Sequence, residues 1–191
     1  ETVKGIFTDE PGLMSHDAWF SPQPMATTPE DPQRTLPGFT LAWTRDMFED
    51  FEQMHGYDLS EQLEHLAIEM DEQTPKVRLD YHRAISQWYA ENFHGQLGEW
   101  CEQQGIEFIG HTMDDPFHKQ VRTQGDQIAA LSKMHRPGCD YLGDSVDAGR
   151  ILACKCASSV AHIEGKRRVP CEALGGAGHD TTLDRMRINL N

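Results

Sequence analysis

The stretch Val3-Lys4-Gly5-Ile6-Phe7-Thr8-Asp9-Glu10-Pro11 sets the expectation for the whole fold. In it, a run of strand length is followed at once by two acidic residues and a proline. A similar arrangement, Arg168-Val169-Pro170-Cys171-Glu172, lies near the other end of the chain. In α/β barrels the functional groups sit at the carboxyl ends of the parallel strands. Both stretches are therefore predicted to place a carboxylate at the same edge of a parallel sheet.

Two further strand-like runs, at residues 106–110 and 139–142, lie between the first strand and a fourth one expected at 168–171. Helical patterns separate them. Alternation of this kind predicts a parallel α/β sheet with right-handed crossovers. Four strand-helix units are half of an eight-stranded barrel, so we predict a partial (β/α)8 TIM-type barrel with a helical insertion after the first strand. An open, doubly wound sheet has the same local pattern, but the turn after the first strand lacks a Gly-rich phosphate fingerprint. The helices are expected at 45–55, 60–70, 75–104, 120–134, 148–164 and 181–188.

The 191 residues suit one domain or a large part of one. Because the chain begins with Glu1 and opens almost directly on a buried strand, we expect residues 1–191 to be a single segment of a larger catalytic domain. The rest of the barrel, or another subunit, is then expected to cover the open sheet edges and the apolar interior. No apolar run is long enough to span a membrane. The sequence does not distinguish an exported protein from a cytoplasmic one.

The net charge of the chain limits which classes of binding partner are expected. There are 17 Lys and Arg residues against 31 Asp and Glu residues, which gives a formal net charge of −14. Such a chain repels a phosphate backbone and an anionic membrane surface, so we predict neither nucleic acid nor membrane as a partner. A solvated acidic surface is the simpler interpretation of the charge, and a cation site among the carboxylates is the sharper one.

Five cysteines are present, an odd number at irregular spacing, which does not indicate a disulfide framework. Cys154 and Cys156 lack the two-residue gap that is usual in zinc sites. We therefore predict that the cysteines are small core residues, and the composition favours a reducing compartment.

Glu10 and Glu172 are the candidate catalytic residues. Pro11 fixes its own φ and predicts an extended backbone for Glu10, which would project that side chain into the mouth of a barrel. A carboxyl group that is held rigidly and partly desolvated suits a general acid. Two carboxylates facing one ligand are the minimal equipment for cleaving a glycosidic bond. The simpler alternatives are a loop acid or helix cap at Glu10, and a salt bridge from Glu172 to Arg167 or Arg168.

Other polar residues follow or lie in the middle strands. His111 ends the second strand and is a candidate to bind a sugar hydroxyl or a metal, although buried histidines more often bond a backbone carbonyl. Either Asp140 or Asp144 is expected to face the barrel mouth. Asp114 and Asp115, just beyond the second strand, are candidate metal ligands or helix caps. Carboxylate ligands of this kind suit Ca²⁺ better than zinc.

Aromatic residues accompany a long segment, residues 11–37, that is rich in Pro, Ser, Thr and Asp. Loops of such length in compact domains are usually functional or disordered. Trp19 and Trp43 are candidates to stack on the apolar face of a sugar ring. The alternative is that these rings only hold the loop in place.

Short pieces in a fixed order, spread over nearly the whole chain, carry a family resemblance. They are Phe7-Thr8-Asp9-Glu10-Pro11, Gly56-Tyr57-Asp58-Leu59, Arg78-Leu79-Asp80-Tyr81, Trp100-Cys101 with Gly105, Gly110-His111, Met134-His135-Arg136-Pro137-Gly138-Cys139-Asp140, Ser158-Ser159-Val160-Ala161-His162 and Cys171-Glu172. In this order they resemble the barrel domain of glycoside hydrolase family 106, which contains α-L-rhamnosidases.

The resemblance implies a catalytic barrel within a large protein, an inverting glycosidase mechanism and a calcium ion near the substrate. It implies that Glu10 is the general acid and that Glu172 is a second carboxylate, acting as base to a water or orienting the sugar. It also implies calcium among acids such as Asp9, Asp114 or Asp115. Relatives carry Glu where this chain has the last two aspartates, which is one departure from the family pattern.

We therefore predict a glycoside hydrolase of the α-L-rhamnosidase type with a carbohydrate substrate. One alternative is a non-catalytic carbohydrate-binding or scaffold domain that keeps the barrel geometry. The other is a metal-dependent hydrolase using His111 with Asp114, Asp140 and Glu172. An oxygen-rich ligand set would favour Ca²⁺, and nitrogen ligands a transition metal.

Overall fold

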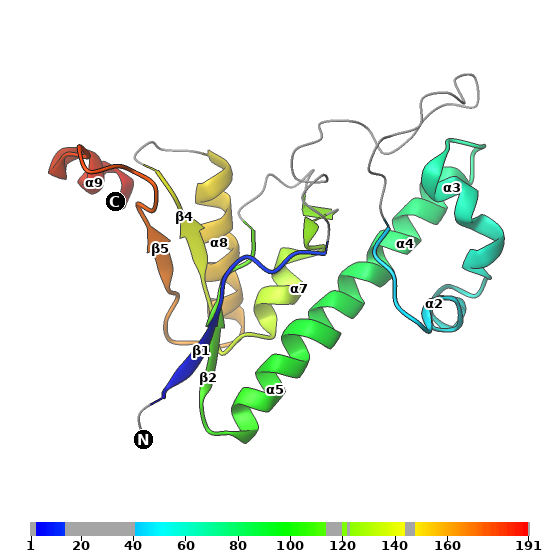
Figure 1. Cartoon of the computed structure of the whole chain (residues 1–191), viewed down its shortest axis with the longest axis horizontal. Helices are drawn as coiled ribbons and strands as arrows, with labels where there is room; N and C mark the ends of the chain where they lie inside the picture. The colour runs from blue at the N-terminus through cyan, green and yellow to red at the C-terminus, as the bar shows by residue number, and fades with distance from the viewer. Residues whose placement is uncertain (1–2, 14–40, 114–119, 122, 144–147, 191) are drawn as a thin grey trace.

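A computed structural model of the chain describes residues 3–13, 41–113, 120–121, 123–143 and 148–190. The described elements alternate between strands and helices, with helices concentrated after the first strand (Figure 1). The strands are β1 (Gly5–Thr8), β2 (Glu107–Gly110), β3 (Arg136–Pro137), β4 (Cys139–Tyr141) and β5 (Cys171–Ala173). The helices are α2 (Met47–His55), η1 (Leu59–Gln62), α3 (Leu63–Ala67), α4 (Thr74–Tyr89), η2 (Ala90–Gly95), α5 (Gln96–Gln103), α7 (Gln127–Ser132), α8 (Ala148–Ile163) and α9 (Leu183–Leu190).

All described strand pairs are parallel. β2 lies between β1 and β3, and β4 pairs with β5. Only Gly138 separates β3 from β4. Its N–H donates to the Gly110 carbonyl at 2.7 Å, and the next N–H, of Cys139, donates to the Pro170 carbonyl at 3.0 Å. The extended stretch from β3 to β4 therefore pairs first with β2 and then with β5. As a result, the four predicted strands stand side by side in chain order.

The junction between β3 and β4 leaves no room for a side chain at Gly138. A Cβ atom there would lie 2.6 Å from the Gly110 carbonyl oxygen, closer than real Cβ atoms come, and 3.0 Å from the Pro170 carbonyl oxygen, which is a tight contact. The neighbouring strands on both sides press on the same α-carbon.

The sequence placed two strands imperfectly. The third begins earlier than predicted, at Arg136, and the fourth is Cys171–Ala173 rather than 168–171. Pro170 cannot donate to a ladder, and only its carbonyl takes part in the pairing. Glu172 consequently lies inside β5 and not after it. The described strands confirm a parallel α/β arrangement, whereas closure into a TIM barrel stays a prediction.

Helices cover one face of the sheet. The long helix predicted at 75–104 is present as α4, the π-helical turn η2 and α5 in direct succession. α5 packs on β2, while α8 packs on β3, β4 and α7. The core between these layers consists of buried Cys101, Phe108, Leu131, Met134, Cys139, Cys156, Ala157 and Val160.

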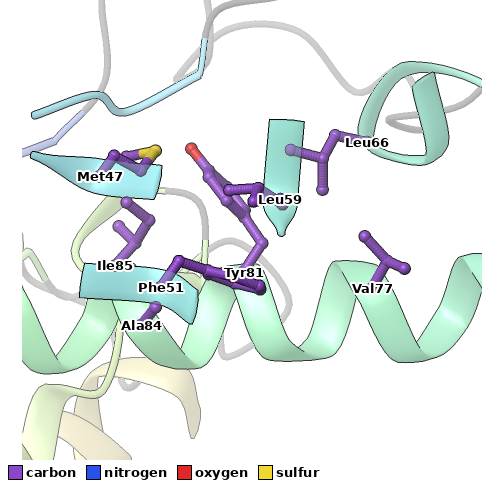
Figure 2. Packing of buried hydrophobic residues seen from close by; sticks show 8 residues of the cluster. All are labelled: Met47, Phe51, Leu59, Leu66, Val77, Tyr81, Ala84 and Ile85. Carbon is purple, nitrogen blue, oxygen red and sulfur yellow. The ribbon is translucent and has the colours of Figure 1, made fainter. Parts of the chain in front are cut away.

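The insertion after β1 has a core of its own along α4 (Figure 2), and α2 and α3 lie well away from the sheet (Figure 1). There α2 and α3 pack on α4, and η1 packs on α2 and α3. Tyr81 anchors the incoming chain, because its hydroxyl donates to the Ala42 carbonyl at 2.7 Å. The buried members of this core are Met47, Phe51, Leu59, Leu66, Val77, Tyr81, Ala84 and Ile85.

Two predicted helices are shorter than expected. The helix predicted at 60–70 is a 3-10 turn followed by α3, and it ends where Ile68 becomes extended. The helix predicted at 120–134 is interrupted at Gly125, which has a φ of 71° and lies against Ser86. Asp126 then caps α7, since its side chain accepts hydrogen bonds from the backbone N–H groups of Ile128 and Ala129. None of the described helices is long and apolar enough to cross a membrane.

Strand pairing sorts the side chains of β4 and β5 onto two faces. Asp140 is paired with Glu172, and Cys139 with Cys171. Because successive residues of a strand point to opposite faces, the two acids share one face and the two thiols share the other. The thiol face lies against α8, where Cys139 packs in the core with Cys156. The acidic side chains are on the face that α8 does not cover.

Candidate active site

Five of the predicted site residues converge at the carboxyl end of the sheet. Asp9 and Glu10 directly follow β1, His111 directly follows β2, and Asp140 and Glu172 lie in β4 and β5. One ligand atom each from Asp9, His111 and Glu172 lies within 4.8 Å of the other two. The same holds for Glu10, His111 and Asp140. His111 belongs to both groups and is the centre of the cluster.

His111 is held by acceptors on both ring nitrogens. Nε2 lies 3.2 Å from Glu172 Oε2 and 3.6 Å from Asp9 Oδ1, and Nδ1 lies 3.4 Å from the Thr112 carbonyl oxygen. The His111 ring is only 2% exposed and packs against the Phe7 ring in a T-shaped contact, with the ring centroids 5.4 Å apart. The imidazole thus links the first, second and fourth predicted strands.

Glu10 does not have the extended backbone that the sequence predicted. Its φ is +42°, in the left-handed region that non-glycine residues rarely adopt. The loop around it is tied to the helical layer, because the Tyr89 hydroxyl donates to the Pro11 carbonyl at 2.6 Å and the Leu13 N–H donates to the Thr123 carbonyl at 2.8 Å. These tertiary bonds override the local preference that Pro11 sets. Such a conformation costs about 1–3 kcal/mol and is often found at functional sites.

Asp140 is the buried carboxyl of the cluster, with 3% exposure. Burial raises its pKa to about 6, with Glu172 and Glu10 adding to the shift and His111 opposing it. No N–H or O–H donor in the described part of the chain reaches its Oδ1 atom. Glu10 lies beside it as a neighbouring carboxyl and adds to the upward shift. The two residues therefore form a close pair of carboxyl groups within the cluster.

The remaining carboxylates are open to solvent. The side chains of Asp9 and Glu172 are 68% and 46% exposed, so a ligand can reach them. Buried His111 lies beneath both. The cluster therefore has a buried base, made of an imidazole and a carboxyl, and an accessible rim of carboxylates.

Other predicted site residues are not part of this cluster as described. Trp43 is half-exposed, and its ring packs edge-to-face on Phe48 at 5.0 Å, next to the helical core of the insertion. Trp19, Asp114 and Asp115 lie outside the described residues.

Sequence reasoning missed that Asp140 and Glu172 are direct partners on neighbouring strands. A signal was present, because Cys139-Asp140 and Cys171-Glu172 repeat the same order of a thiol followed by an acid. Aligning the two dipeptides as neighbouring parallel strands puts both acids on one face. The same alignment brings two cysteines together on the other face, where the sequence had predicted only core residues.

The thiol face contains a second cluster. Sγ atoms of Cys139, Cys154 and Cys171 all lie within 4.8 Å of one another. The hydrogen bond with Cys139, reinforced by one with Cys171, lowers the pKa of Cys154 to about 7, although burial opposes the shift. The thiol of Cys139 has the opposite shift, a raised pKa, chiefly because of the same bond with Cys154.

Carboxylates gathered around a histidine at the carboxyl ends of parallel strands lie where α/β enzymes keep their active sites. A model of the α-L-rhamnosidase family, Glyco_hydro_106, matches residues 38–186. The chain belongs to this glycoside hydrolase family, which confirms the resemblance seen in the sequence.

The chain is also similar to individual proteins. A putative beta-glucuronidase from Formosa agariphila is 27% identical over 143 residues, which are 73% of this chain and 11% of that protein. The solved structure of a rhamnosidase from Novosphingobium sp. PP1Y matches with a TM-score of 0.58 at 24% identity, over 69% of this chain and 13% of that one. The structural match supports a shared α/β fold. The chain spans only about a tenth of the length of these relatives.

Proposed function

We propose that the protein is a glycosidase of the α-L-rhamnosidase type, and that this segment supplies its acid and its second carboxylate. The observation that carries the proposal is the convergence of Glu10, Asp140 and Glu172 around His111, in a chain of a glycoside hydrolase family. Sugar cleavage needs a proton donor for the departing oxygen and a carboxylate for the other half of the reaction. Both kinds of group are present in the cluster.

Glu10 is the proposed general acid. It is the more accessible member of its pair with Asp140, and it stands at the end of β1 where a ligand can approach. Glu10, His111 and Asp140 each offer a ligand atom within 4.8 Å of the other two, so the proposed acid stands within the cluster. Asp140, at 3% exposure, is placed to act on Glu10 rather than to touch the sugar.

Glu172 is the proposed second carboxylate. Its Oε2 atom lies 3.2 Å from His111 Nε2, which holds one carboxylate oxygen in place. The exposed remainder of the group can accept a proton from water or a hydrogen bond from a sugar hydroxyl. In an inverting enzyme, acid and base carboxyls stand roughly 6.5–9.5 Å apart, with the attacking water between the base and the sugar.

A calcium ion near the substrate also fits the chemistry of the cluster. Asp9 and Glu172 are exposed carboxylates whose oxygens come within 4.8 Å of each other, and like charges at this distance favour a cation beside them. Ca²⁺ takes oxygen ligands, so we propose Asp9 as a ligand, together with Asp114 or Asp115. His111 offers nitrogen, which suits a role in orienting Glu172. When bound, the ion would attract and orient sugar hydroxyl groups.

The remaining strands are proposed to come from the rest of the protein. β1 forms one edge of the described sheet, and β5 is paired on one side by β4. On β1, Ile6 and Phe7 expose 37% and 52% of their surface. An apolar edge strand of this kind is a surface that native proteins cover. Further barrel strands on these edges would shield it and complete the pocket around Glu10 and Glu172.

The test is a screen of the intact protein against aryl glycosides, including the α-L-rhamnoside and the β-glucuronide. We expect cleavage of the α-L-rhamnoside, and loss of that cleavage in both Glu10→Gln and Glu172→Gln. Glu102→Gln, at an exposed position of α5, is the matched control and should keep full activity. Full activity in both active-site variants would remove this cluster from the reaction.

A further inference from the structure

The three-cysteine cluster on the outer face of the sheet is separate from the carboxylates. Cys139 is in β4, Cys171 is its direct partner in β5, and Cys154 comes from α8, which packs on β4. The alternation of the strands turns these thiols away from the face of Asp140 and Glu172. Nothing in the proposed sugar chemistry uses them.

The three thiols form a triangle with one open side. Their Sγ atoms all lie within 4.8 Å of one another, and each of them hydrogen-bonds to the other two. Cys139 is buried, Cys154 is half-buried and Cys171 is exposed. The cluster therefore has a dry floor and a solvent-facing edge through which a small ion and a water can enter.

Its dimensions suit a metal better than a disulfide. With Zn–S bonds of about 2.3 Å, sulfurs of a tetrahedral site stand about 3.8 Å apart, which the triangle reaches with small side-chain movements. A disulfide requires two sulfurs at about 2.0 Å and leaves the third thiol without a role. All five cysteines of the chain are thiols in the structure.

We propose that Cys139, Cys154 and Cys171 bind a thiophilic divalent metal ion of the Zn²⁺ type, with three thiolate ligands and a water or another small ligand at the open side. Soft thiolates select such ions over Ca²⁺ or Mg²⁺. Binding exchanges thiol protons for metal–sulfur bonds and releases these protons to solvent. The metal would clamp β5, which carries Glu172, to β4 and α8.

Cd²⁺ is a suitable probe, because its thiolate complexes absorb in the ultraviolet. The intact protein, reduced and freed of metal, is titrated with Cd²⁺ and then with competing Zn²⁺. We expect a thiolate-to-metal absorption band that saturates at one equivalent, is displaced by Zn²⁺ and is accompanied by proton release. The metal should also raise the thermal unfolding midpoint, a readout that does not depend on activity.

Cys171→Ala is the decisive variant, because Cys171 is exposed and its loss leaves the core packing in place. We expect it to weaken Zn²⁺ binding by at least about tenfold. Cys101→Ala, which removes a thiol from the same core outside the triangle, is the matched control and should bind as the parent does. Circular dichroism confirms that both variants fold.

Three outcomes would overturn the proposal. The first is no saturable band at one equivalent of Cd²⁺. The second is unchanged binding in Cys171→Ala. The third is a disulfide within the triangle in protein isolated without reductant, together with an absence of metal binding after reduction.

Discussion

Asp140 and Glu172 stand directly opposite each other on β4 and β5, so that two acids of the cluster are neighbours across a single parallel ladder. The buried one has its pKa raised to about 6, mainly by burial, and the exposed one bonds to His111. The two acids therefore share one face of the sheet but differ in how far a ligand can reach them.

Replacing the proposed acid should affect substrates according to their leaving groups. Glu10→Gln keeps the size of the side chain but removes the proton donor. We expect kcat to fall by roughly 10²–10⁴-fold on unactivated glycosides, the usual contribution of general acid catalysis. The loss should be smaller for a nitrophenyl glycoside, whose leaving group needs little protonation. An equal loss on both substrates would argue for damage to binding instead.

The left-handed backbone at Glu10 predicts an inverted order of stability. At an ordinary position, alanine is more stable than glycine by about 0.4–1 kcal/mol. With a φ of +42°, Glu10→Gly should be at least as stable as Glu10→Ala, because glycine adopts this conformation without strain. Urea unfolding of the two variants measures the difference. The usual preference for alanine would show that this residue has an ordinary backbone in solution.

The junction between β3 and β4 should not tolerate a methyl group. Gly138→Ala would bring a Cβ atom to 2.6 Å from the Gly110 carbonyl oxygen, so we expect a loss of about 1–3 kcal/mol in unfolding free energy. Gly12→Ala is the control, because its Cβ would find only ordinary contacts at 3.5 Å or more. Equal unfolding free energies for the two variants would contradict the strand junction.

His94 should make the fold sensitive to acid. Its side chain is fully buried among the rings of Tyr89, Phe93 and Phe108, with no hydrogen-bond partner for either nitrogen in the described structure. Burial lowers its pKa from 6.5 to about 4. Below pH 6.5, His94 binds a proton in the unfolded chain, whereas in the folded chain it does so only below about pH 4. The free energy of unfolding therefore falls as the pH drops from about 6.5 to about 4.

The measurement for His94 is the free energy of unfolding in urea at pH 7 and at pH 5. His94→Phe should reduce the loss between these two values, because phenylalanine fits an aromatic pocket and does not titrate. His162→Gln, at an exposed position of α8, should leave the loss unchanged. Identical pH dependence in the parent and His94→Phe would mean that other groups cause the acid sensitivity.

Removal of calcium should reduce activity if the ion binds beside Asp9. We expect a calcium-selective chelator to lower turnover of the intact enzyme, added Ca²⁺ to restore it, and Asp9→Asn to raise the Ca²⁺ concentration needed for restoration. Asp126→Asn, at the cap of α7, is a control that retains capping ability and should restore at the parent's concentration. Insensitivity of the parent to the chelator would contradict the calcium proposal.

The sequence predicted what depends on local pattern. The order of four parallel strands followed from apolar runs and helical periodicity, and the acids after β1 and the histidine after β2 were found at the ends of such runs. The conformation of Glu10 depends on bonds from Tyr89 and Thr123, which are distant in the chain, and no local rule contains them. The thiol cluster likewise depends on the register of β4 against β5, which periodicity alone leaves open.

The change of strand partner at Gly138 has a mechanical consequence. Gly138 donates its N–H to Gly110 at the end of β2, and the next residue, Cys139, donates its N–H to Pro170 just before β5. The position of His111 relative to Glu172 therefore depends on the backbone at this one residue. Any slippage there would displace Glu172 relative to His111 without altering a single reactive atom. The arrangement of the proposed acids therefore depends on a residue that has no side chain to contribute to it.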